Sequence, residues 1–169
     1  MKTRLFAAFA AILIVGGIFS QAAHSATPVA QHGPFTVSAL DDGQTCMLSA
    51  ANETAGFALG VSANDAVITI GAANSAAPFI DGQRYTIKLV VDGQTFDWNA
   101  TGLSYGSTPG VIALSPDVEG VYSTLTTGEN LTIYTAEGAG VVSVNLDANF
   151  DSAFNDTVYC ALLVSGKAK

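Results

Sequence analysis

The chain has 169 residues and a formal net charge of −8, from fourteen acidic and six basic side chains. At this length we expect one domain with its own core. An acidic surface repels nucleic-acid phosphates and anionic lipid headgroups, so the composition argues against nucleic acid as a partner and favours a protein partner with a basic surface. Acidity that serves solubility alone is the simpler alternative.

Residues 1–25 have the pattern of a secretory signal peptide. Lys2 and Arg4 precede an apolar run from 5 to 19, and the small residues of SQAAHSA follow. We expect cleavage after Ser25, which places the protein in the periplasm or outside the cell. Because the apolar run is shorter than the ~20 residues of a bilayer span, we expect no stable membrane insertion after cleavage. Removal of the leader changes the formal charge to −10.

Residues 26–34 are expected to form a flexible lead-in, and residues 35–166 a single domain. Apolar positions there repeatedly alternate with polar ones, and Gly, Asn and Asp separate the runs, which is typical of antiparallel strands. About ten short strands favour an all-β fold, an antiparallel β-sandwich, with a closed β-barrel as the alternative. Besides a hairpin at 84–100, the expected strands are 35–40, 45–50, 57–63, 66–72, 110–114, 121–125, 131–136, 140–146 and 157–164.

The hairpin at 84–100, RYTIKLVVDGQTFDWNA, is the clearest unit. Alternate residues from 85 to 91 are large and apolar, and we assign this face to the core. Asp92 and Gly93 suit a tight turn, since glycine tolerates positive φ. The stretch 99–110 is rich in Gly, Ser and Thr and is expected to be a loop or an irregular edge. A short helix is expected at 115–119, where Ser115 could cap and Pro116 suits a first helical position.

The two cysteines lie near the ends of the expected domain, Cys46 in QTCMLSA and Cys160 in TVYCALLV. An oxidising compartment favours a disulfide between them, which would join the first strands to the last. A catalytic cysteine is the alternative, but neither residue has a histidine nearby in sequence.

The segment 145–154, NLDANFDSAF, resembles the opening of a calcium-binding loop, with Asp147, Asn149 and Asp151 at alternate positions. Such a loop requires Gly at its sixth position and Glu at its twelfth, where this chain has Ser152 and Val158. We therefore interpret 147–156 as a polar connection between two strands. Phe150, Ala153 or Phe154 would turn inward there, and adventitious weak calcium binding is the alternative.

No catalytic, metal or cofactor site is expected. After leader removal His32 is the remaining histidine, so neither a serine triad nor a zinc site has its usual side chains. Carboxylate pairs such as Asp41 with Asp42, Asp92 with Asp97, or Asp151 with Asp156 could serve a glycosidase, and sequence does not place them in space. The aromatic residues Trp98, Tyr105, Tyr122, Tyr134 and Tyr159 could form a sugar-binding patch, although core packing explains them more simply.

The C-terminal half is similar to the invasion-associated locus B family of exported bacterial proteins. The stretches YTIKLVVDGQTF, LTTGENLTIY and GVVSVNLDANFDSAFNDTVYC carry the similarity, with Leu125, Gly128, Leu131, Leu146, Ala153 and Cys160 in the family's pattern. Asp147 departs from it, because the family usually has glycine after that leucine. The resemblance implies a periplasmic or secreted β-sandwich with a part in host-cell interaction, and it implies no catalytic residues.

These observations favour an exported, non-catalytic binding or interaction protein of the bacterial envelope. Two alternatives are a structural subunit of a surface fibre, suggested by strands rich in Gly, Ala, Thr and Asn, and an inhibitor of a cationic enzyme such as lysozyme, suggested by the charge. A carboxylate-based glycosidase ranks last.

Overall fold

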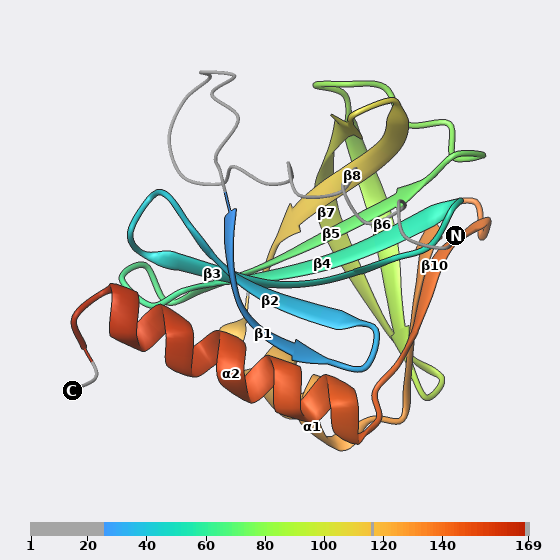
Figure 1. Cartoon of the computed structure of the whole chain (residues 1–169). Helices are drawn as coiled ribbons and strands as arrows, with labels where there is room; N and C mark the ends of the chain where they lie inside the picture. Colours follow the sequence, from blue (N-terminus) through green and yellow to red (C-terminus); the bar gives the residue numbers. More distant parts are fainter. Residues whose placement is uncertain (1–25, 116, 168–169) are drawn as a thin grey trace, which may run out of the picture.

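The computed structural model describes residues 26–115 and 117–167, and these contain ten strands and two helices (Figure 1). In chain order the elements are β1 Ala26–His32, β2 Phe35–Leu40, β3 Thr45–Ala51, β4 Ala55–Ser62, β5 Val67–Asn74, β6 Arg84–Val91, β7 Gln94–Tyr105, β8 Thr108–Leu114, α1 Val118–Thr127, β9 Asn130–Thr135, β10 Gly140–Asn145 and α2 Ala148–Val164.

The strands form one antiparallel sheet in the order β1-β2-β3-β4-β5-β8-β7-β6-β9-β10. The sheet folds over so that β10 contacts β4 and β5 across the interior, where the Asn74 amide donates to the Val141 carbonyl at 2.8 Å. The edge strands β1 and β10 do not pair with each other, so the sheet is not closed. The fold is therefore the expected antiparallel β-sandwich rather than the closed barrel.

The predicted hairpin is confirmed as β6 and β7. Ile87, Leu89 and Val91 are buried on one face of β6, and Trp98 is buried on the return strand. The turn residues Asp92 and Gly93 have φ values of 48° and 86°, which suit a two-residue turn with positive φ at both positions. The strand alternation and the turn residues thus agree on one register.

The C-terminal segment corrects two predictions, because 147–156 is no connection between strands and 157–164 is no strand. Both belong to α2, which packs against β1–β4 (Figure 1). The inward residues recur at helical spacing, and they are Phe150, Ala153, Phe154, Thr157, Cys160 and Ala161. Phe150, Ala153 and Phe154 are fully buried, so their inward orientation is confirmed.

The segment before β9 is a second helix where a strand was predicted at 121–125. Asp117 caps α1, since its Oδ1 accepts the Gly120 amide at 3.0 Å. The helix predicted at 115–119 thus begins later, at Val118, and runs on to Thr127. Ser115 accepts the Asp117 amide at 3.1 Å instead of capping the helix, and Pro116 lies outside the described residues.

Two other segments are more regular than expected. Residues 26–32, part of the expected flexible lead-in, form the edge strand β1, which pairs with β2 from Ala26↔Leu40 to His32↔Phe35. Most of 99–110, expected to be a loop or irregular edge, belongs to β7 and β8, which continue their pairing to Tyr105↔Thr108. Ladder hydrogen bonds stabilise both segments although their side chains lack strong alternation.

Candidate functional site

The candidate site is a groove over the outer face of β1–β5, the face opposite α2. Cys46 reaches α2, so its neighbour Met47 points to the opposite face of the sheet. On that outer face, small residues of neighbouring strands lie opposite one another and form rows across the sheet. One row pairs Thr36 with Ser49, Ser49 with Ala58, and Ala58 with Gly71.

Described residues of β1–β5 and their turns line a groove of about 770 Å³ over this face. At one side stands the β3–β4 turn with Asn52 and Glu53, and at the β5 side stands Tyr105 from the end of β7. Leu40, Met47 and Ala58 form a small apolar cluster within the face. The groove is therefore lined mostly by short side chains together with Met47 and Ala58 of this buried cluster.

Tyr105 is fixed in its wall by burial and by one hydrogen bond. Its hydroxyl donates to the Val111 carbonyl at 3.0 Å, and burial raises the pKa of the phenol far above its ordinary value. The ring lies over Gly110, where a Cβ would overlap the ring carbons. Tyr105 therefore stays neutral at physiological pH and serves as a rigid wall of the groove.

Most polar groups at the groove have partners within the protein. The Thr36 hydroxyl donates to Gln31 Oε1 at 3.0 Å, and Gln31 Nε2 donates to the Gly33 carbonyl at 2.9 Å. Asn52 Oδ1 accepts the amides of Thr54 and Ala55, each at 2.9 Å. These bonds leave the surface near them with little demand for water or for a polar ligand.

Ser38 also lines the groove, and it is 6% exposed. It lies between Pro28 of β1 and Met47 of β3 in the paired register.

The charge at the groove has one sign. Glu53 is exposed on the β3–β4 turn, and none of the described lining residues is Lys or Arg. Together with the net charge of the chain, this favours a neutral or basic ligand over an anionic one.

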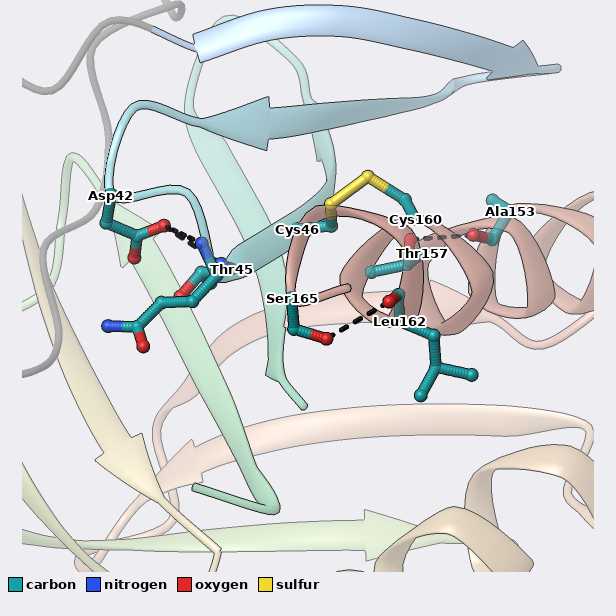
Figure 2. Close-up of a disulfide and its surroundings, with 9 residues drawn as sticks. Asp42, Thr45, Cys46, Ala153, Thr157, Cys160, Leu162 and Ser165 are labelled. Carbon is teal, nitrogen blue, oxygen red and sulfur yellow. Dashed lines mark hydrogen bonds between the residues drawn. A yellow bond between two sulfur atoms is a disulfide. The ribbon is translucent and has the colours of Figure 1, made fainter. Parts of the chain in front are cut away.

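The predicted disulfide joins Cys46 and Cys160, but it connects β3 to a helix rather than to a last strand (Figure 2). The Cα atoms are 5.9 Å apart, and Cys46 is fully buried. Asp42 shapes the approach to Cys46, since its Oδ1 accepts the amides of Gln44 and Thr45 at 2.9 Å each. The bridge thus fixes α2 on the inner face of the strands whose outer face forms the groove.

The acidic residues at 147–151 act in the folding of α2. Asp147 Oδ1 accepts the Asn149 and Phe150 amides at 2.9 and 3.1 Å, and the Phe150 amide foremost lowers the pKa of this carboxyl. Within residues 26–115 and 117–167, no group of three or more His, Cys, Asp or Glu could hold a metal ion. Asp147 is therefore a helix cap.

His32 lies at the end of β1, where its Nε2 is 2.7 Å from Asp156 Oδ2 of α2. This contact joins an edge strand to the helix on the inner face, away from the groove floor. The predicted aromatic residues do not form one patch, because Trp98 and Tyr105 are buried and Tyr122 packs against Phe154.

Sequence reasoning missed the groove, although its signal is present in the strands. Thr36 and Ser38 alternate with Phe35 and Val37, and Ser49 and Ala51 lie at alternate positions of β3. A strand with large residues on one face and small residues on the other gives its sheet a tightly packed face and a flat one.

Comparisons of the chain with protein-family models, curated proteins and solved structures gave no match. Neither helix of the described chain has the length and apolar character needed to cross a membrane.

Proposed function

We propose that the chain is an exported, non-catalytic binding protein of the bacterial envelope that holds a protein partner on the outer face of β1–β5. The leader pattern and the cysteine pair support export to the periplasm or the exterior. The negative charge favours a partner with a basic surface. The similarity to the invasion-associated locus B family is compatible with a role in host-cell interaction.

The observation that carries the proposal is the groove. Its described lining includes Thr, Ser, Ala and Gly in aligned rows beside the buried Leu40, Met47 and Ala58 cluster, and no Lys or Arg. Short side chains leave room for close approach by a second molecule.

The sheet edges favour this face over edge pairing, as a fibre subunit would use. Pro28 in β1 has no amide hydrogen, and the β1–β2 register shifts between Pro28 and Ala30. At the other edge, the Val141 carbonyl of β10 accepts the Asn74 amide. Each edge thus departs from the regular row of free groups that strand addition requires.

A pair of matched variants tests the proposal. Ser49→Trp would fill the groove floor, whereas Asn99→Trp adds the same side chain at an exposed position of β7 outside the groove. Tagged wild-type protein and both variants would be used to recover partners from envelope extracts over a range of salt concentrations, with identification by mass spectrometry. The affinity of a purified candidate would then be measured.

We expect the wild-type protein and Asn99→Trp to retain a specific partner, and Ser49→Trp to lose it. Recovery of no partner at any salt concentration would contradict the proposal, as would equal affinity of the purified partner for both variants. Binding that survives groove filling but disappears with salt would instead favour a charge-driven inhibitor of a cationic enzyme.

A further inference from the structure

Four Asn residues lie in Asn-x-Thr triplets, the sequence at which exported proteins accept an N-linked glycan. They are Asn52, Asn99, Asn130 and Asn155, and all four are exposed. The chain has eight Asn and sixteen Thr among 169 residues, so chance alone predicts about one such triplet. A glycosyltransferase must reach both the Asn amide and the Thr hydroxyl, and the structure separates the four triplets on this point.

Asn52 and Thr54 are presented together on the turn between β3 and β4. Both side chains are exposed, and the Asn52 backbone amide donates to the Ala55 carbonyl at 2.9 Å across the turn. Asn52 Oδ1 accepts the Thr54 hydroxyl at 3.2 Å, besides the amides of Thr54 and Ala55. The two side chains thus lie side by side on a bent, solvent-facing backbone. These bonds use the amide oxygen and not Nδ2, the atom that takes the sugar.

The triplets of Asn99 and Asn130 belong to paired strands. Residues 99–101 lie within β7, which pairs with β6 on one side and, from Ala100 onward, with β8 on the other. Asn130 begins β9, and the Thr132 hydroxyl is hydrogen-bonded to the Ser143 hydroxyl of β10 at 3.0 Å. A transferase that bends either segment would have to break ladder hydrogen bonds first.

Asn155 lies on the exposed side of α2, but the Thr of its triplet is inaccessible. Thr157 is fully buried, and its hydroxyl donates to the Ala153 carbonyl at 2.7 Å. A transferase reaches this hydroxyl only after local unfolding of the helix. The fold therefore leaves one triplet, at Asn52, with both recognition groups open to a second molecule.

We infer that Asn52 is the N-glycosylation site of the folded, exported chain, with a lipid-linked oligosaccharide as the sugar donor. Nδ2 of Asn52 forms a bond to the anomeric carbon of the first sugar. The bond from that carbon to the lipid diphosphate breaks, the diphosphate leaves with the electron pair, and a base of the transferase takes a proton from Nδ2. The inference does not depend on the proposed binding function, although Asn52 also lines the groove.

A defined reaction tests the site on the folded, disulfide-bonded protein. It contains a purified single-subunit oligosaccharyltransferase that accepts Asn-x-Ser/Thr and a lipid-linked oligosaccharide, and peptide mass spectrometry follows each Asn with time. Each rate is divided by the rate of a short synthetic peptide with the same triplet, which removes the preferences of the transferase for neighbouring residues. We expect this ratio at Asn52 to exceed the other three at least about tenfold.

An equal or higher ratio at Asn99, Asn130 or Asn155 would overturn the inference. So would an Asn52 peptide that the transferase does not accept, or a peptide that is accepted while Asn52 of the protein is not.

Matched variants separate recognition from folding. Thr54→Val removes the hydroxyl and keeps the shape of the side chain, so it should abolish modification of Asn52, whereas Thr54→Ser should retain it. Thr101→Val, the same change in β7, should leave the rate at Asn52 unchanged. Circular dichroism confirms that each variant is folded. Modification of Asn52 that survives Thr54→Val would contradict recognition of the triplet.

The protein recovered from the envelope of the cell that produces it gives the last test. Its mass should exceed that of the polypeptide by a glycan located at Asn52, and a peptide N-glycosidase should remove the excess. The mass of the bare polypeptide, or a glycan at another Asn alone, would overturn the inference and leave the binding function untouched.

Discussion

Removal of the disulfide tests how much the covalent link contributes to the sandwich. Cys46 and Cys160 are 114 residues apart, so the bridge closes most of the domain into one loop. In the chain-entropy description, a loop of this length restricts the unfolded chain by about 5 kcal/mol at 25 °C. Strain and residual structure in the unfolded chain reduce this value, and we expect a loss of about 3–5 kcal/mol in the double variant Cys46→Ala/Cys160→Ala.

The double variant should still fold, because the fully buried Phe150 and Phe154 anchor α2 by packing as well as by the bridge. Guanidinium unfolding, followed by circular dichroism and by Trp98 fluorescence, gives the free energy of unfolding and its dependence on denaturant. That dependence should increase, since the unlinked chain exposes more surface when it unfolds. A loss below about 1 kcal/mol would refute the entropic reasoning. Loss of helix signal in the absence of denaturant would refute the view that packing alone holds α2.

Three further predictions concern packing, backbone approach and capping. Phe154→Ala should lower the free energy of unfolding by about 3–5 kcal/mol, because the ring is fully buried beside Phe150 and Tyr122. If thermal unfolding gave a loss of less than half this free energy, the packing would be contradicted. Gly102→Ala should be strongly destabilising, since its Cβ would overlap the Ile80 carbonyl. Gly60→Ala is the control, because its Cβ would make only ordinary contacts. Equal melting temperatures of the two variants would disprove the close approach of Ile80 to Gly102. Asp147→Ala should destabilise α2 at neutral pH. The folded pKa of Asp147 is lowered, so its stabilisation is complete above the unfolded pKa and disappears as pH falls through the folded pKa; unfolding curves of wild type and variant that fail to converge in acid would contradict the cap.

The sequence predicted correctly those parts of the fold where strand alternation and turn residues indicate the same structure. In the β6–β7 hairpin, strict alternation assigns one face to the core and Asp92-Gly93 supplies the turn, so register and burial follow together. The disulfide was predicted from the expected oxidising compartment and from the presence of two cysteines. Phe150, Ala153 and Phe154 were assigned to the interior from their apolar character, even though the segment was given the wrong secondary structure.

The helix α2 was missed, and α1 was predicted only as a short helix at 115–119, because the residues of both favour strands by type. The sequences VYSTL and TVYCALLV contain Val, Tyr and Thr, which are common in strands, and strand propensity outweighed the weaker helical spacing. The aspartate that begins each helix was the available signal. Asp117 and Asp147 both accept amides three residues ahead, and Asp147 was interpreted through its resemblance to a calcium loop instead.

The groove could not be predicted from any single strand, since it exists only where the register aligns small residues from neighbouring strands. The inner row of Val37, Leu48, Leu59 and Ile70 is large and fully buried, while the adjacent outer positions are small except for Met47. Packing of the core explains the inner row completely. The outer positions hold Thr, Ser, Ala and Gly beside the buried Met47 and Ala58, and the inner core does not explain that choice. The run of short side chains on one face across four strands is therefore the feature on which the proposed binding function depends.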